Sequence, residues 1–365
     1  MAPKLTIITP VYNAEGLLGR ALASLQSQTL GFENLRWVLV DDQSTDGSFS
    51  LIQGWARQYP NITVLQTAEN SGSAAAPRNL ALGRVDTPYV MFLDNDDAFA
   101  PDACRALVDA AERTGADLVS GYFQDVDADG APLGDRHPSC GPAGQPDRLY
   151  RLPEELEAAA AVQGIFWCKL YRMELILANA VTFPTDTLME DSVFFAKYLL
   201  CCRTMFYTDA LIYRFSARGD SLSRTPNARY VLSRAVGYDH LFALYAGQPA
   251  VLRLNLENVA AHFLPLIFSS PDILPEERPA LLRAWRRAAA YSLREGLCPD
   301  DPVLKKLMEL TGAGRVDAAL AVGELLESWR AEIGRRDELF LAADRNWKAV
   351  CAENEALKAR LAEQG

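Results

Sequence analysis

The chain has 365 residues, 49% hydrophobic and 23% charged, which is enough apolar material for one large or two medium domains with a packed core. Its formal net charge of −11 argues against nucleic acid as the main partner. The seven cysteines are odd in number and form no Cys-x-x-Cys pair, which argues against a disulfide framework or a zinc site and favours a reduced cytoplasmic setting.

Membrane-targeting signals are not evident in the sequence. The first residues run directly into a strand-like segment, so we expect no signal peptide. No apolar run reaches spanning length, because Lys197 interrupts the stretch 193–200. We therefore expect a cytoplasmic protein, and peripheral association with the inner face of the membrane stays open.

Short apolar runs alternate with helical stripes over the first 125 residues. Strands are expected at 5–9, 36–40, 62–65, 89–93 and 117–125, with helices near 16–27, 44–59, 73–82 and 100–114. Alternation of this kind is typical of an α/β fold with a parallel sheet and right-handed crossovers.

The next hundred residues are less regular. Residues 127–145 are rich in Gly, Pro and Asp, which indicates an irregular excursion. Helices are expected at 154–162 and 190–200, and an extended segment at 205–215. After Asn227 the composition shifts to Ala, Leu, Arg and Glu in a helical pattern.

This shift suggests a domain of residues 1–226, a helical region 227–330 and a C-terminal helix 331–365. Within the C-terminal helix a single seam position recurs every seven residues, at Ile333, Phe340, Trp347, Asn354 and Leu361. A coiled coil that joins copies of the chain and an amphipathic helix folded onto the protein's own body explain this pattern about equally well.

The expected strand at 89–93 ends in a cluster of carboxylates, Asp94, Asp96 and Asp97. Ligands of open parallel sheets bind just beyond the carboxyl ends of the strands. Carboxylates this close repel one another, and a hard divalent cation such as Mg²⁺ or Mn²⁺ would relieve the repulsion. An acidic turn before the next helix is the alternative explanation.

Polar residues also follow the first two strands. Tyr12, in Thr-Pro-Val-Tyr-Asn, offers a stacking face for a flat polar base. Asp42, at the end of the second strand, can accept the imide N–H of uracil or a ribose hydroxyl. An ordinary strand-to-helix turn would also explain the segment with Tyr12, whereas the segment with Asp42 is more specific.

Two further segments carry charge. Small residues at 70–77 lead to Arg78, whose planar guanidinium suits a base or a phosphate, although a tight turn with a surface arginine gives the same pattern. Glu190 and Asp191 open an apolar helix, where the helix dipole alone favours carboxylates.

Taken together, these segments resemble the glycosyltransferase family 2 proteins, inverting enzymes with a GT-A (Rossmann-like) fold. The resemblance covers roughly residues 4–224. It is carried, in this order, by Thr-Pro-Val-Tyr-Asn, Val-Asp-Asp-Gln-Ser-Thr-Asp-Gly-Ser, Asn-Ser-Gly-Ser through Pro-Arg-Asn, Phe-Leu-Asp-Asn-Asp-Asp, Trp-Cys-Lys-Leu-Tyr-Arg and Glu-Asp. Two positions depart from the family pattern: Pro77, where Ala is usual, and Cys168, where Asn is common.

The resemblance implies a nucleotide-diphospho-sugar donor, often UDP-linked, held on Mn²⁺ or Mg²⁺. By motif position, Asp42 and Arg78 would contact the base, and Asp94 and Asp96 would serve the ribose and the metal-bound diphosphate. Asp191 would be the general base. The donor site would further include Pro10, Tyr12 and Asn95, with Asp96 as the metal ligand.

We therefore expect an inverting glycosyltransferase of cell-surface polysaccharide or glycoconjugate synthesis, with a saccharide or lipid-linked acceptor and a C-terminal helical extension. Residues 216–224 would close over the diphosphate as a lid, or else form a plain connector. A non-catalytic scaffold that binds sugar nucleotides is the alternative. A nucleotidyltransferase fits less well, because it usually carries a basic Gly-rich loop and residues 10–16 lack Lys and Arg.

Overall fold

The computed structural model describes residues 2–139, 146–152, 154–157, 165–216, 227–248, 250–252, 259–297 and 302–328. Chain contacts divide the molecule into two compact units, Met1–Glu257 and Asn258–Gly365. The expected boundaries at 226 and 330 stay predictions. The helix that begins after Asn227 belongs, by its contacts, to the first unit.

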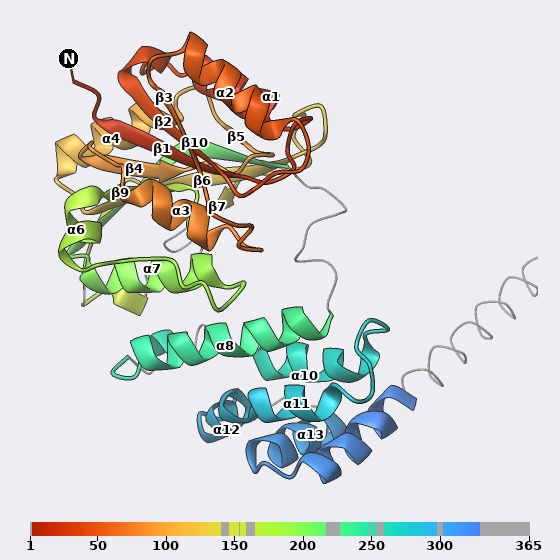
Figure 1. Ribbon diagram of the computed structural model, residues 1–365. Helices are drawn as coiled ribbons and strands as arrows, with labels where there is room; N and C mark the ends of the chain where they lie inside the picture. Colours follow the sequence, from red (N-terminus) through yellow and green to blue (C-terminus); the bar gives the residue numbers. More distant parts are fainter. Residues whose placement is uncertain are drawn as a thin grey trace, which may run out of the picture. The chain divides into compact units, whose positions relative to one another are not determined.

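The first unit is built on one ten-stranded sheet with the order β3-β2-β1-β4-β9-β6-β10-β5 (Figure 1). Two short strands lie off this path, β7 (His137–Pro138) beside β6 and β8 (Arg148–Arg151) beside β10. The strands of the main path are β3 (Ile62–Gln66), β2 (Leu35–Asp41), β1 (Leu5–Val11), β4 (Tyr89–Phe92), β9 (Lys169–Arg172), β6 (Leu118–Val126), β10 (Thr204–Ser216) and β5 (Ala98–Phe99).

The expected parallel sheet is present only over some of the strands. Strands β3, β2, β1 and β4 run parallel, as the alternation of strands and helices predicts. Beyond β4, the strands β6 and β10 also pair parallel. The expectation is wrong for the short strands β9 and β5, because β9 is antiparallel to both β4 and β6, and β5 is antiparallel to β10. β9 reads Lys-Leu-Tyr-Arg, and a strand of four residues has the same alternation in either direction, so its pattern could not predict the direction of β9.

Both faces of the sheet are buried, which explains the continuous apolar runs of its central strands. Figure 1 shows α1 (Leu18–Gln26) and α2 (Ser48–Gln58) on one face, and α3 (Ala75–Leu82), α6 (Met173–Ala178) and α7 (Glu190–Cys201) on the other. Met91 packs in the core cluster that includes residues of α1, α2 and α4 (Ala103–Thr114).

The opposite face of β4 packs against aromatic side chains. Phe92 makes edge or tilted contacts with four aromatic rings, among them Phe183 and, on α7, Phe194, at centroid distances of 5.4 and 5.5 Å. Consecutive residues of β4 thus bury on opposite faces, as the pleat of a strand requires. Packing on both faces holds β4 in place and thereby fixes the position at which the acidic loop begins.

Helices form the rest of the described chain. In the first unit, α8 (Ala228–Leu244) packs against α7, and the side chain of Asn227 caps its start by accepting a hydrogen bond from the Tyr230 N–H. The second unit contains α10 (Val259–Ser269), α11 (Arg278–Ala284), α12 (Arg286–Arg294) and α13 (Pro302–Gly312). Trp285 is fully buried there and stacks on Phe263, with ring centroids 4.9 Å apart.

Several expectations lie outside the described residues. They are the heptad seam of 331–365, the lid beyond Ser216, and stretches of the excursion at 127–145 and of the helix at 154–162. Within the portion of the chain that the structure does describe, no helix combines the length and apolar character needed to cross a membrane.

Candidate donor-binding site

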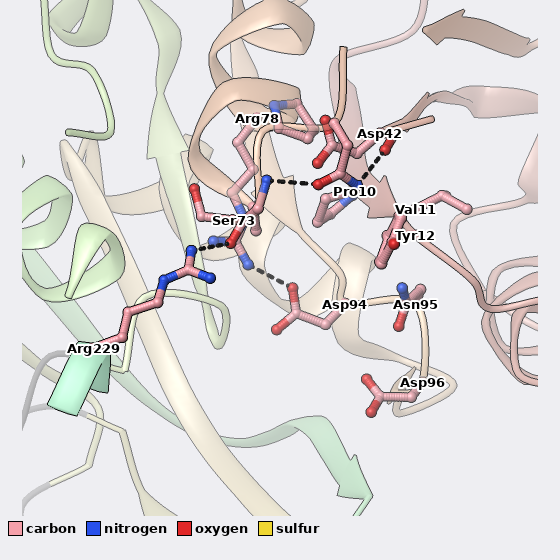
Figure 2. Close-up of a pocket in the computed structure, with 14 residues that line it drawn as sticks. Pro10, Val11, Tyr12, Asp42, Ser73, Arg78, Asp94, Asn95, Asp96 and Arg229 are labelled. Atoms are coloured by element: carbon pink, nitrogen blue, oxygen red, sulfur yellow. Dashed lines mark hydrogen bonds and ion pairs between the residues drawn. The ribbon is translucent and has the colours of Figure 1, made fainter. Parts of the chain in front are cut away.

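A cavity of about 540 Å³ lies beyond the carboxyl ends of β1, β2 and β4 (Figure 2). The order of the sheet reverses between β1 and β4, and ligands of open α/β sheets bind at such a switch point. The structure brings all the residues predicted to bind donor or metal into the lining of this cavity: Pro10, Tyr12, Asp42, Arg78, Asp94, Asn95 and Asp96. The rest of the wall consists of Val11, Asn70, Gly72, Ser73, Ala74, Pro77 and Arg229.

Asp42 lies at the end of β2 with only 4% of its surface exposed. Its carboxylate accepts hydrogen bonds from the Thr67 hydroxyl at 2.8 Å and from both the backbone N–H and the hydroxyl of Ser71. Gln43 follows with a φ of 61°, in the left-handed region, and this turns the chain away from the sheet. These contacts fix the carboxylate in one orientation at the cavity wall.

Tyr12 and Asn13 follow β1 and have different surroundings. Tyr12 is 48% exposed and lines the cavity, so its ring offers a face for stacking. Asn13 has a φ of 48°, a conformation that Asn tolerates better than most residues. Its side-chain oxygen accepts a hydrogen bond from the Thr45 N–H at 2.8 Å, which ties together the loops after β1 and β2.

Arg78 connects three elements around the cavity. It is buried, donates to Asp94 at 2.8 Å and to Glu190 at 3.1 Å, and lies 4.4 Å from the centroid of the Phe166 ring. It therefore joins α3, the loop after β4 and the start of α7. Its positive charge is balanced by two protein carboxylates.

The three aspartates of the acidic loop have different roles. Asp94 and Asp96 line the cavity, whereas Asp97 is buried and does not line it. Asp97 accepts hydrogen bonds from the Tyr213 hydroxyl at 2.8 Å and the Ser216 N–H at 2.7 Å, and the same hydroxyl accepts from the Asp94 N–H. The loop is thereby attached to the end of β10.

The environment of Asp97 disfavours a negative charge. Burial, together with the negative charges of Asp94 and Asp96, raises the pKa of its carboxyl well above the usual range. Trp167 stacks on the Tyr213 ring with centroids 4.1 Å apart, which fixes the hydroxyl that Asp97 contacts. Asp97 is thus a structural member of the acidic cluster.

The predicted general base lies apart from the cavity wall. Asp191 is in the first turn of α7 and accepts a hydrogen bond from the Ser192 N–H at 2.6 Å. Burial raises the pKa of its carboxyl, and that of the adjacent Glu190. The described residues that line the cavity do not include Asp191.

The remaining motif residues pack in the protein interior. The Cys168 thiol donates to the Tyr122 carbonyl at 3.2 Å, so this departure from the family pattern lies in the core. Lys169 is fully buried and donates to the Ser139 carbonyl at 2.9 Å. Both positions support the fold around β9.

The described residues contain no group of three or more His, Cys, Asp or Glu side chains placed to hold a metal ion. A structural metal site would need such a group, but a metal ion that binds together with a substrate does not. Mg²⁺ in phosphate-transfer sites is typically held by one or two carboxylates and by substrate phosphates. Asp94 and Asp96 both line the cavity, and their carboxylates are the kind of ligand that such a site uses.

A second, smaller cavity of about 210 Å³ shares Ser73 and Arg229 with the first. Its lining is rich in hydroxyls and also contains a carboxylate and apolar side chains: Ser71, Ser73, Thr185, Asp186, Thr187, Leu188, Arg229, Leu232, Ser233 and Val236. Asp186 is already paired with His240, at 2.9 Å.

Sequence reasoning did not identify Arg229. It lies on α8, after the last family motif, in a stretch whose composition indicates only helix. Asn227 is a recognisable cap and could have predicted where the helix begins. No local signal predicts that α8 would return to the loop 70–74.

Comparison with known proteins agrees with this geometry. The model of the family "Glycosyl transferase family 2" matches residues 6–176. A poly(ribitol-phosphate) beta-glucosyltransferase of Bacillus spizizenii is 31% identical over 192 residues, which are 52% of this chain and 28% of that protein. The putative glycosyltransferase EpsH of Bacillus subtilis is 24% identical over 338 residues, or 90% of this chain and 92% of that protein.

Solved structures extend the similarity to the fold. The crystal structure of residues 1–349 of Staphylococcus aureus TarS in complex with UDP-GlcNAc matches with a TM-score of 0.68 and 21% identity, over 90% of this chain and 92% of that one. The chain spans only 28% and 43% of two of the curated relatives that it matches. The expected α/β fold of GT-A type with C-terminal helices is confirmed. Residues 6–176 are similar to the glycosyl transferase family 2 domain.

Proposed function

We propose that the protein is an inverting glycosyltransferase that moves a sugar from a nucleotide-diphospho-sugar, most simply a UDP-sugar, to a hydroxyl acceptor in cell-surface polysaccharide synthesis. One observation carries the proposal: a single cavity at the switch point of the sheet gathers Tyr12, Asp42, Arg78, Asp94 and Asp96. Relatives named as poly(ribitol-phosphate) glycosyltransferases, and the UDP complexes of TarS, support the donor and the polymer class.

The cavity offers each portion of such a donor a chemically suitable neighbour. The exposed ring of Tyr12 can stack on the base, and the Asp42 carboxylate can accept its imide N–H. Asp94 and Asn95 can hydrogen-bond the ribose hydroxyls. Arg78 contributes to the base site mainly by holding Asp94 in place, because its guanidinium is engaged with two carboxylates.

Asp96, with Asp94 beside it, would hold the divalent cation together with the donor's phosphates. Mn²⁺ or Mg²⁺ there supplies charge neutralisation for the departing diphosphate.

Asp191 is the proposed general base, which takes the proton of the acceptor hydroxyl on the face of the sugar opposite the leaving group. Its raised pKa suits this role, because a base works best when its pKa approaches the operating pH. The Asp191 carboxylate would have to become accessible to the acceptor when donor is bound.

The test is a thermal-shift titration with UDP, with and without Mn²⁺, followed by a donor-hydrolysis assay with a panel of UDP-sugars. We expect UDP to raise the Tm only when Mn²⁺ is present, and Asp96→Ala to abolish that metal-dependent rise. Unchanged UDP binding by Asp96→Ala with Mn²⁺ would remove Asp96 from the site. Metal-dependent UDP binding without any hydrolysis or transfer would instead favour a non-catalytic sugar-nucleotide scaffold.

The acceptor and the location complete the proposal. A saccharide or lipid-linked acceptor fits the polymer-glycosylating relatives. Such acceptors are met at the inner face of the membrane, where a cytoplasmic protein would reach them by peripheral association. Self-association through residues 331–365 stays a separate prediction.

A further inference from the structure

Arg229 occupies the junction between the two cavities of the first unit. It is the second residue of α8, is exposed, and lines both cavities. Figure 2 shows its side chain extending from α8 to the loop that carries Ser73. One of its nitrogens donates to the Gly72 carbonyl at 3.3 Å, which holds the guanidinium at the cavity rim.

The charges around the larger cavity single out this arginine. Its lining contains three carboxylates, Asp42, Asp94 and Asp96, and two cations, Arg78 and Arg229. Arg78 is balanced by ion pairs with Asp94 and with Glu190. Among the residues that the structure describes, no carboxylate forms an ion pair with Arg229, which has a single carbonyl contact. It is therefore the cation of this cavity whose charge no described protein group compensates.

A guanidinium has five N–H donors in a planar fork, and this geometry suits two oxygens of one phosphate. Gly72 uses one of the donors of Arg229, so a fork remains for an anion at the junction. A hydroxyl-rich wall lies on the far side, with Thr185 and Ser233 lining only the smaller cavity.

We propose that Arg229 binds a phosphate group of the substrates at the junction of the two cavities. The inference rests on the proposed function, because it assumes that the larger cavity holds a nucleotide-diphospho-sugar. The phosphate has two possible sources: the diphosphate of the donor, or a phosphate on an acceptor unit that occupies the smaller cavity.

The donor is tested by calorimetric titration of UDP and of uridine, both with Mn²⁺, into wild type, Arg229→Met and Arg229→Lys. Loss of a charge-assisted contact weakens binding by about ten- to a hundredfold. If the donor supplies the phosphate, Arg229→Met weakens UDP binding by that factor and leaves uridine binding unchanged. Arg229→Lys falls between, because it keeps the charge and loses the fork.

The acceptor is tested with the same variants saturated with UDP and Mn²⁺, by titration of ribitol 5-phosphate and of ribitol. If the acceptor supplies the phosphate, Arg229→Met weakens binding of ribitol 5-phosphate only, while its UDP affinity stays at the wild-type value. Arg84→Met is the matched control: it removes one exposed arginine that lines neither cavity, and it should change neither titration.

The two possible failures are distinguishable. If Arg229→Met binds UDP as tightly as wild type does, and also binds ribitol 5-phosphate as tightly, the inference is overturned. The proposed function is then still intact. A wild-type protein that binds no UDP overturns both. A melting temperature of Arg229→Met equal to that of Arg84→Met shows that a loss of affinity does not come from unfolding.

Discussion

Adjacent carboxylates in this molecule have different surroundings, and sequence alone does not separate them. Glu190 pairs with Arg78, whereas Asp191 accepts a hydrogen bond from the backbone of its own helical turn. Asp96 lines the cavity, whereas Asp97 is buried beneath it. Substitutions at these positions should therefore give separable effects on chemistry, binding and stability.

Asp191→Asn tests the proposed base. Asn keeps the size of the side chain and the oxygen that accepts from the Ser192 N–H, but it cannot take a proton. We expect transfer to fall by about a hundred- to ten-thousandfold, while UDP affinity stays near the wild-type value. Because burial raises the pKa of Asp191, the ionised form is disfavoured in the folded state, so the variant should lose no stability at neutral pH.

Glu190→Gln serves as the neighbouring control. It removes the ion pair with Arg78 while leaving Asp191 in place, so it should affect donor binding more than the rate of the chemical step. Transfer near the wild-type rate in Asp191→Asn would show that the proton goes elsewhere, and Glu190 would be the next candidate.

Asp97→Asn should show a pH-dependent gain in stability. Burial and the charges of Asp94 and Asp96 raise the pKa of the Asp97 carboxyl in the folded state, so the folded protein binds this proton more tightly than the unfolded chain. Wild-type stability therefore falls as the pH rises from the unfolded pKa towards the folded one. Thermal denaturation at pH 4 and pH 7 should show a Tm gap between variant and wild type that is larger at pH 7.

A difference in Tm between Asp97→Asn and wild type that is the same at pH 4 and at pH 7 would mean that the pKa of Asp97 is not raised by folding. A loss of stability at both would mean that the hydrogen bonds from Tyr213 and Ser216 need a carboxylate acceptor.

At the scale of elements, Arg78 holds α3, the acidic loop and α7 together. Arg78→Met would leave Asp94 and Glu190 facing each other without a cation, in a site where Glu190 has only 12% of its side chain exposed. Removing one partner of a buried ion pair costs about 3–5 kcal/mol. Urea denaturation should show a loss of this order, and UDP binding should weaken with it; Arg84→Met should show neither.

A stability change within about 0.5 kcal/mol, as expected for an ordinary surface substitution, would contradict this role of Arg78. It would return Arg78 to the simpler prediction of a direct contact with the base.

The elements that sequence predicted well are those set by local pattern. The strands at β1 to β4 follow from apolar runs ended by turn residues, and the residues just after them meet because parallel strands end at one edge of the sheet. The direction of β9 and the return of α8 to the loop at Gly72 depend on long-range packing. Neither Lys169–Arg172 nor Arg229 has a local feature that encodes such packing.

At the scale of the whole molecule, the C-terminal tail offers a test of assembly. The heptad seam at 331–365 predicts that removal of residues after Arg330 lowers the oligomeric state and spares donor hydrolysis. Light scattering before and after truncation measures the mass directly. A monomer in both cases would favour the alternative, in which this helix folds onto its own chain.

The position of β10 limits how far this protein can be shortened. β10 pairs with β6 from Leu118 to Val126, and it begins well after residue 176, where the matched family stretch ends. A fragment stopped there would leave β6 as a bare edge strand and would uncover Trp167, which stacks on Tyr213. Unpaired edges with exposed aromatic side chains recruit other copies into aggregates. The smallest fragment that stays soluble therefore has to extend past Ser216.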